Sequence, residues 1–379
     1  MPAPHPPGFF DIETRTAKLT AMGDPLVKLN AQINWEAFRP DLARVHERER
    51  KSNAGAKPID VVLMFKMLVL QHLYNLADEG IEYQVRDRLS FMRFLGLQLE
   101  DRVPDAKTVW LFRERLKDLK LVEALFARFH QQLAAHGYVA RAGQMIDATF
   151  VEAPRQRNTR EENARIKAGT PPEDWPDNKK RQKDVDARWT KKNNETHYGY
   201  KNHINADEAN KLVQEYAVTD AAVHDSQVFE ELLDQTQDED GVPQGDFLRG
   251  VPQGDFLRGA KRAVYADSAY RSQEHEEKLA ADNMPSQICE KGTRGHPLTD
   301  ARKEANRVKS TVRARVEHVF GAQAQMGGHI VRTIGLERAK VKIGMMNLVY
   351  NMKRLGQLLK RDAKRLFCPD GGRGAPVVA

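Results

Sequence analysis

The stretch Gln144-Met-Ile-Asp-Ala-Thr-Phe-Val151 is a short apolar run interrupted by one carboxylate, Asp147. A second run of the same kind, Ala263-Val-Tyr-Ala-Asp-Ser-Ala-Tyr270, carries Asp267. Both runs are predicted to be buried strands. Because a buried charge is costly unless metal or hydrogen bonds compensate it, the two aspartates are predicted to serve a site rather than a core.

A third acid, Glu317, lies in the strongly helical segment Val312-Arg-Ala-Arg-Val-Glu-His-Val-Phe320, beside an apolar stripe. Each acid alone has an ordinary structural explanation: Asp147 capping a turn, Asp267 making an Asx turn, or Glu317 pairing with Arg313. Carboxylates at strand ends, however, converge at the edge of an α/β sheet. Taken together, the three acids favour one common site.

Three carboxylates supply the hard oxygen ligands that select Mg²⁺ or Mn²⁺. Two such ions, roughly 3.5 to 4 Å apart, clamp both oxygens of an in-line phosphoryl displacement. The sequence therefore predicts a two-metal enzyme that acts on nucleic acid. Arg313 and Arg315 flank Glu317 and are candidates to hold a phosphate or orient the carboxylate. His224 is an auxiliary candidate, although His-Asp-Ser is also a common helix start.

Composition supports this reading without proving it. The chain has 379 residues, a net charge of +7 and a pI near 9.2. Its length favours two domains, and its charge favours a polyanionic partner or simply solubility. Cys289 and Cys368 lack zinc-site spacing, which indicates a reducing compartment. Neither a membrane helix nor a signal peptide is predicted, so we expect a cytoplasmic protein without a membrane partner.

The amino-terminal part is predicted to be helical. Residues 1–24 are rich in proline and are expected to be flexible, and residues 25–137 are expected to form an all-α DNA-binding domain. Helices are predicted after Pro58, over Tyr83 to Leu95, and after Asp105. The last of these carries Lys107, Arg113 and Lys117. It is either a helix-turn-helix-like element that contacts DNA phosphates or part of a plain bundle with a solvated basic face.

Residues 138–356 are predicted to alternate strands and helices. The expected strands are Gln144 to Val151, Thr196 to Asn205, Leu212 to Thr219, Arg262 to Asp267 and a weak Ser286 to Cys289; the expected helices are Ser226 to Leu233 and one long helix over Asp300 to Ala324. This order predicts an α/β, ribonuclease-H-like mixed sheet with flanking helices. Lys201 and His203 on the second strand are candidates to line a DNA channel.

Two segments interrupt this domain, and a basic tail is expected over residues 357–379. A basic insertion covers about residues 153–195. Between Arg155 and Lys192 it holds twelve Lys or Arg against seven Asp or Glu, with little apolar periodicity. It is predicted to be either a disordered loop or an arm that contacts DNA. The other is a perfect tandem repeat of nine residues over 241–258, best explained as a duplication in an exposed loop.

Several motifs resemble bacterial insertion-sequence transposases of the "insertion sequence five" group. Tyr83-Gln-Val-Arg-Asp-Arg-Leu-Ser-Phe-Met-Arg-Phe-Leu-Gly96 and Val103-Pro-Asp-Ala-Lys-Thr-Val-Trp-Leu-Phe-Arg-Glu-Arg-Leu116 are similar to the family's amino-terminal domain. The similarity to its DDE catalytic domain is carried by Ile146-Asp-Ala-Thr, His197-Tyr-Gly-Tyr-Lys-Asn-His203, Val218-Thr-Asp-Ala-Ala-Val-His-Asp225, Ala266-Asp-Ser-Ala-Tyr270, Arg315-Val-Glu-His-Val-Phe320 and Lys342-Ile-Gly-Met-Met-Asn-Leu-Val-Tyr-Asn351.

The resemblance implies a DDE transposase that cuts at terminal inverted repeats and joins the freed 3′-hydroxyl to target DNA. By motif, Asp147, Asp267 and Glu317 are the catalytic and metal-binding acids, and two Mg²⁺ or Mn²⁺ ions are expected. Double-stranded DNA is the implied partner, bound by at least a dimer near the bacterial nucleoid. Where many relatives carry a basic residue seven positions after the glutamate, this chain has Ala324. A stand-alone nuclease and an inactive DNA-binding regulator remain alternatives.

Overall fold

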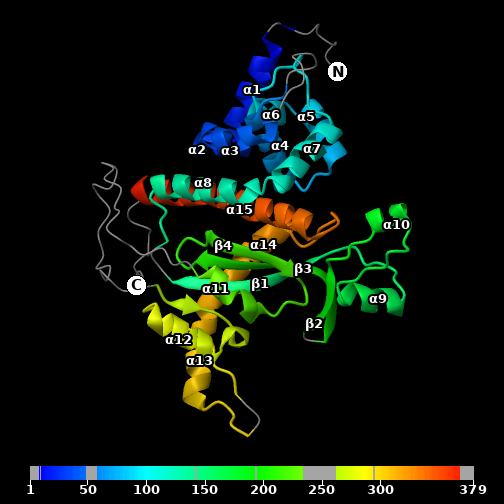
Figure 1. Cartoon of the computed structure of the whole chain (residues 1–379). Helices are drawn as coiled ribbons and strands as arrows, with labels where there is room; N and C mark the ends of the chain where they lie inside the picture. Colours follow the sequence, from blue (N-terminus) through cyan, green and yellow to red (C-terminus); the bar gives the residue numbers. More distant parts are fainter. Residues whose placement is uncertain are drawn as a thin grey trace, which may run out of the picture. The chain divides into compact units, whose positions relative to one another are not determined.

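The computed structural model describes residues 8, 10–47, 58–140, 143–192, 194–233, 262–292 and 295–367. The chain divides into two compact units, one drawn from residues 1–113 and 349–379 and the other from residues 114–348 (Figure 1). The tandem repeat at 241–258 lies outside the described residues. None of the helices in the described ranges combines the length and hydropathy needed to cross a bilayer.

The first unit is helical, as predicted. It contains α1 (Asp11–Ala21), α2 (Pro25–Gln32), η1 (Trp35–Phe38), α3 (Arg39–Ala43), η2 (Arg44–His46), α4 (Val61–Leu73), α5 (Asp78–Asp87), α6 (Leu89–Leu95), the greater part of α7 (Ala106–Asp118) and the end of α15 (Leu336–Phe367). Helix α4 is its centre: Asp60 caps the helix by accepting from the backbone of Val62 and Leu63. Ten of its thirteen residues are buried, so it is the core element that the apolar spacing after Pro58 indicates.

Three helix predictions need correction in detail. The single helix expected over Tyr83 to Leu95 is two, α5 and α6, because Arg88 between them is extended at φ −109° and ψ 114°. The flexible segment expected over residues 1–24 contains α1, which Arg93 holds through hydrogen bonds to Thr16 O and Thr20 Oγ1 at 3.0 and 2.7 Å. Residues 357–367, expected in a tail, continue α15.

The second unit is built on a mixed five-stranded sheet. Its strands are β1 (Gln144–Glu152), β2 (Arg188–Lys192), β3 (Glu195–Asp207), β4 (Val213–Asp220) and β5 (Val264–Tyr265). The order is β2-β3-β1-β5, and β4 pairs with β3 alongside β2. All pairs are antiparallel except β1 with β5, which is parallel. The mixed sheet predicted from the sequence is confirmed; the weak fifth strand is reduced to a bridge between Val264 and Ser286.

Helices cover both faces of this sheet. Alternation along β1 sends Ile146 to one face, where it packs in a cluster with Phe229 of α11 (Phe229–Leu232) and Leu279 of α12 (Gln273–Ala281). Val151 points to the other face, into a cluster that includes Ile343 of α15. Helix α8 (Leu121–Ala135) also belongs to this unit, where its Phe126 contacts Tyr216 of β4 with ring centroids 4.9 Å apart.

The long helix expected over Asp300 to Ala324 is broken. The structure has α13 (Asp300–Arg313), a 3₁₀ turn η6 (Ala314–Val316) and α14 (Glu317–Gln325). Glu317 is therefore the first residue of a new helix rather than a mid-helix residue. Val316 just before it and Val319 just after it are buried, which fixes the turn against the rest of the unit.

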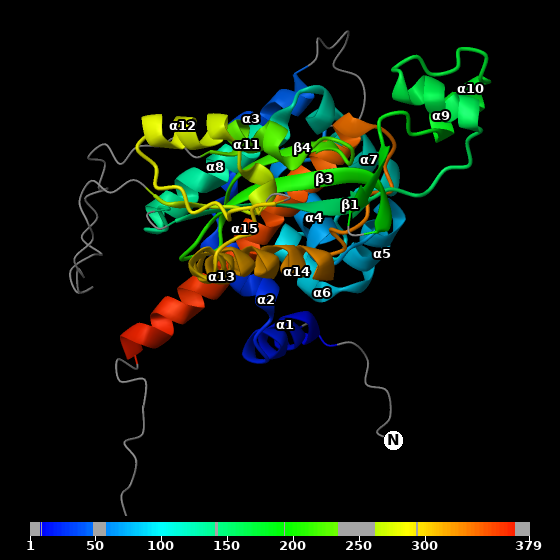
Figure 2. The same cartoon turned by 90° about the horizontal axis from the view of Figure 1, so that it is seen from below.

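The basic insertion contains regular structure, which contradicts the disordered-loop alternative and leaves the DNA-contacting arm as a prediction. It contains α9 (Arg160–Lys167), begun by a capping box between Thr159 and Glu162, and α10 (Asp177–Gln182). Trp175 is buried, and its Nε1 donates to Glu162 at 2.8 Å. Glu162 also pairs with Lys179. Figures 1 and 2 both place these helices beyond the β2 end of the sheet.

Gly199→Ala is expected to destabilise this unit by about 2–3 kcal/mol, because a side chain there has neither backbone freedom nor space. Gly199 lies in β3 with φ +146°, and an added Cβ would collide with Val151 O and lie 2.6 Å from Ala153 N. Urea unfolding measures the loss. The matched control is Gly321→Ala in α14, where a Cβ meets nothing within 4 Å and helix propensity favours alanine. Equal stability of the two variants would contradict this prediction.

Candidate active site

Two of the predicted acids lie at the same level of neighbouring parallel strands, although Asp147 lies within β1 and not at its end as predicted, and only Asp267 follows the end of its strand. In the ladder between β1 and β5, Met145 is paired with Tyr265. Asp147 and Asp267 each follow two residues later, so their side chains point to the same side of the sheet, next to the carboxyl end of β5. The short strand β5 is held on its other edge too, where Val264 N donates to Pro285 O at 3.0 Å. The ladder thus brings together two acids 120 positions apart in the chain.

Asp147 is the buried acid of the site, at 6 % exposed. Its Oδ1 accepts from the backbone of Ala148 at 2.8 Å, and its Oδ2 accepts from Arg313 Nη1 at 2.7 Å. Burial raises the pKa of Asp147 to about 6, against the lowering effect of the Arg313 charge. Asp267 and Glu317 raise this pKa further, which shows that all three acids lie within one electrostatic neighbourhood.

Asp267 and Glu317 are more accessible than Asp147. Asp267 is half-buried and caps a 3₁₀ turn, η5 (Ser268–Tyr270), by accepting from Ala269 N at 2.7 Å. The Asx turn considered from the sequence is therefore present, and it coexists with the site. Glu317 is exposed. Arg313, four residues earlier, pairs with Asp147 across the site and not with Glu317 along the helix.

The three carboxylates are the type of ligand that a hard divalent cation prefers, but they do not form a complete coordination site in this structure. Among the described residues, no group of three or more His, Cys, Asp or Glu side chains has the spacing of a metal cluster. Burial is the main cause of the raised pKa of Asp147, the charges of Asp267 and Glu317 add to it, and Arg313 supplies the compensating positive charge. A bound cation would therefore stabilise the ionised form of these carboxylates. The ligands that they offer are all oxygen atoms, which hard divalent cations prefer.

The predicted DNA-contacting residues divide into two groups. Lys107 and Arg315 are exposed, Arg315 with an ion pair to Glu208 at 2.9 Å. Arg113 and Lys117 are held within the chain: Arg113 pairs with Asp78 and Lys117 pairs with Glu114, at 2.7 and 2.8 Å. Lys201 and His203, at 7 % and 0 % exposed, are buried in the sheet.

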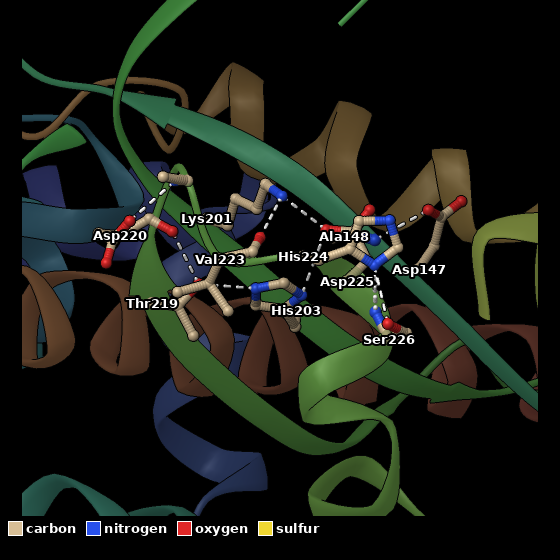
Figure 3. A network of polar contacts seen from close by, with 11 residues as sticks. Asp147, Ala148, Lys201, His203, Thr219, Asp220, Val223, His224, Asp225 and Ser226 are labelled. Carbon is tan, nitrogen blue, oxygen red and sulfur yellow. Dashed lines mark hydrogen bonds and ion pairs between the residues drawn. The ribbon is translucent and has the colours of Figure 1, made fainter. Parts of the chain in front are cut away.

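Lys201 and His203 instead form a buried polar network (Figure 3). Lys201 Nζ donates to Val223 O and to Asp225 Oδ1, both at 2.7 Å. These two contacts flank His224, an exposed residue that caps η3 (Asp225–Val228). His203 Nε2 lies 2.9 Å from Thr219 Oγ1, and burial lowers the pKa of His203 to about 4. The network fixes the turn after β4 that carries His224.

Tyr270 is a residue that sequence reasoning did not single out. It is fully buried, and its hydroxyl finds no hydrogen-bond partner within the described part of the chain. Burial raises its pKa, and the charges of Asp225, Asp147 and Asp267 raise it further. Tyr270 lies three residues after Asp267, and a 3₁₀ turn puts residues with this spacing on one side. This spacing is the sequence signal that could have identified Tyr270.

Comparison with known proteins agrees with this architecture. A model of the transposase domain (DUF772) matches residues 13–115, and a model of the transposase DDE domain matches residues 140–352, more than half of the chain. Among solved structures, a piggyBac transposase synaptic complex with hairpin DNA is similar, at 12% sequence identity and a TM-score of 0.42, with 89% of this chain and 76% of that chain covered. As the resemblance to the "insertion sequence five" group predicted, the chain belongs to the DDE transposases, enzymes of phosphoryl transfer on DNA with a ribonuclease-H-like catalytic domain.

Proposed function

We propose that this transposase binds the terminal inverted repeats of its own insertion sequence and catalyses metal-dependent strand cleavage and strand transfer. One observation carries the proposal: Asp147 of β1 and Asp267, just after β5, lie at the same level of adjacent parallel strands, and the charge of Glu317 contributes to the raised pKa of Asp147. Three acids of this kind at one sheet edge suit metal-assisted displacement at phosphorus.

Asp147, Asp267 and Glu317 would hold Mg²⁺ or Mn²⁺, with two ions expected. When bound, the ions act as Lewis acids that lower the pKa of a water molecule or of the DNA 3′-hydroxyl and stabilise the leaving oxygen. Arg313 compensates the charge of Asp147 in this structure. Its side chain is 26% exposed and its guanidinium contacts Asp147, so it can turn to a DNA phosphate once Asp147 is otherwise neutralised.

The partner is double-stranded DNA, both transposon end and target, held by a dimer or larger assembly in the bacterial cytoplasm at the nucleoid. Lys107 and Arg315 are the predicted contacts whose exposure supports a direct role. Arg113, Lys117, Lys201 and His203 support DNA binding indirectly, by holding helix α7 and the sheet in shape. Helical residues 25–137 are the proposed end-binding part.

Incubation of the purified protein with Mg²⁺ and a duplex that carries the element's end tests the function. We expect a nick at the end and, with a pre-nicked end and a target plasmid, covalent joining of the 3′-hydroxyl. Cleavage without joining would identify a nuclease instead. Specific binding of the end without either reaction would identify a DNA-binding regulator and would overturn the proposed catalysis.

A further inference from the structure

An exposed tryptophan stands on the outermost strand of the sheet. Trp189 of β2 is 44 % exposed, whereas Trp35 and Trp175 are 6 % and 5 % exposed. Its ring lies 4.8 Å from that of Tyr198, tilted by 38°, and the guanidinium of Arg155 lies 5.6 Å from its centroid. We call Trp189, Tyr198 and Arg155 the aromatic platform. A large ring left in water at a sheet edge is a candidate interaction site.

The surroundings of the aromatic platform are basic. Arg155, Lys191 and Lys192 are all exposed, and none of them is engaged in an ion pair within the described part of the chain. The acid Glu152 nearby pairs with His197 at 3.5 Å. The platform joins Arg155 and Trp189, which lie near the two ends of the basic insertion. Between Arg155 and Lys192, Lys and Arg outnumber Asp and Glu by five. Free cations beside an aromatic ring suit a partner with phosphates and planar rings.

The aromatic platform and Asp147 share one face of the sheet. Trp189 is paired with Tyr198, and Asp147 is paired with Ile204, six residues further along β3. An even number of residues keeps side chains on one face, and six residues of strand span about 20 Å. Tyr200 and Asn202, which lie between them on this face, are buried, so the platform is a contact separate from the acids and not part of one continuous open surface.

We propose that Trp189, with Tyr198 and Arg155, stacks an unpaired base of the DNA strand and that Arg155 and Lys191 hold the phosphates next to that base. The inference rests on the proposed function, because it supplies a second contact for the same DNA. Inside a duplex the faces of each base are covered by the neighbouring base pairs, so an unpaired, unstacked nucleotide is what offers a ring to Trp189. The platform therefore prefers single-stranded over double-stranded DNA.

Tryptophan fluorescence tests the proposal without metal and without catalysis. The full chain is titrated with a short single-stranded oligothymidylate and, separately, with the matching blunt duplex. We expect the single strand to quench the emission and the duplex to quench it much less. In Trp189→Phe the quenching is lost, while binding measured by fluorescence anisotropy of a labelled oligothymidylate changes by no more than about threefold, because Phe keeps a stacking ring.

Two further variants complete the test. Trp189→Ala is expected to weaken single-strand binding by roughly 5- to 150-fold, since each stacked base contributes about 1–3 kcal/mol. Trp175→Phe is the matched control: Trp175 is buried, at 5 % exposed, and is not part of the platform, so the variant is expected to keep both quenching and affinity. Exposed Trp189 is not needed for folding, which circular dichroism of each variant checks.

Quenching that persists in Trp189→Phe, or equal quenching by duplex and single strand, overturns the aromatic platform. This outcome is independent of the catalytic proposal. If cleavage fails but the Trp189-dependent quenching is found, the platform stands and the proposed reaction falls. If cleavage and joining succeed but Trp189→Ala binds single strands as tightly as the unchanged chain, only the platform is overturned.

Discussion

Asp147→Asn is expected to abolish metal-dependent cleavage by this transposase while making the folded chain more stable at neutral pH. The amide keeps the volume but loses the anionic ligand. Because a metal ligand at the reacting centre is worth several kcal/mol of transition-state stabilisation, we expect a loss of at least about 10³-fold in rate. Binding of end-bearing duplex, measured by mobility shift, is expected to remain, since Asp147 contributes no positive charge.

The gain in stability follows from the pKa of the same group. Burial raises the pKa of Asp147 from 3.8 to about 6 in the folded chain. The folded state therefore binds a proton that the unfolded state has lost, and the free energy of unfolding falls as pH rises from about 4 to about 6. Two pKa units correspond to about 3 kcal/mol at most. Urea unfolding without metal, from pH 4 to pH 8, should show this decline in the unchanged chain and not in Asp147→Asn.

Asp184 provides the matched control, because it is also buried, at 3 % exposed, but lies away from the acids. Its carboxylate accepts from Tyr200 Oη at 2.8 and 2.7 Å and from the backbone of Asp186 and Ala187. Asp184→Asn is expected to lower stability and to keep measurable cleavage. Near-normal cleavage by Asp147→Asn, or a stability loss as large as that of Asp184→Asn, would show that Asp147 is a structural residue.

Lys201→Met is expected to lower the free energy of unfolding by about 3–5 kcal/mol, because it leaves the Asp225 carboxylate buried without a counter-charge. Lys201 and Asp225 are 7 % and 8 % exposed, and Lys201 Nζ also satisfies Val223 O. Urea denaturation measures the loss. A surface lysine that contacts DNA would give a much smaller change in stability and a large change in binding.

The double variant Lys201→Met, Asp225→Asn separates the ion pair from the loss of packing. We expect it to recover part of the stability, since no charge is then left buried alone. Its cleavage rate reports on the turn that carries His224, because both of the lost contacts flank that residue. If Lys201→Met alone leaves stability unchanged within about 0.5 kcal/mol, the ion pair is not a fixed feature of the fold.

The sequence predicted β1, β3, β4 and β5, because buried apolar strands leave a local signal, but it missed β2, whose residues were assigned to the basic insertion. Gln144 to Val151 and β1 agree to one residue, and the helix begun after Asp105 is α7. Prediction from the sequence failed where packing against another element determines the backbone conformation. Nothing local in Arg88 ends a helix, and nothing local stops the helix before Glu317. Such breaks depend on packing partners far away in the sequence.

The candidate site shows the same division. Asp147 and Asp267 were predictable because a carboxylate in an apolar strand is locally anomalous. The partners were not. Arg313 was assigned to the helix or to phosphate, but it pairs with Asp147 across 166 positions of sequence. Lys201 was assigned to DNA by its charge, yet burial turned it inward. Charge is visible in a sequence, whereas the identity of its partner is a property of the folded chain.

The parallel pairing of β1 with β5 determines when the acids can come together during synthesis of the chain. The three acids stand at positions 147, 267 and 317, and a two-residue strand late in the chain brings the second beside the first. A nascent chain on the ribosome therefore carries Asp147 long before it has a complement of acids. On the proposed assignment, a chain that ends before residue 317 lacks Glu317 and cannot complete the set of acids. We therefore expect DNA cleavage only from a chain that extends past Glu317.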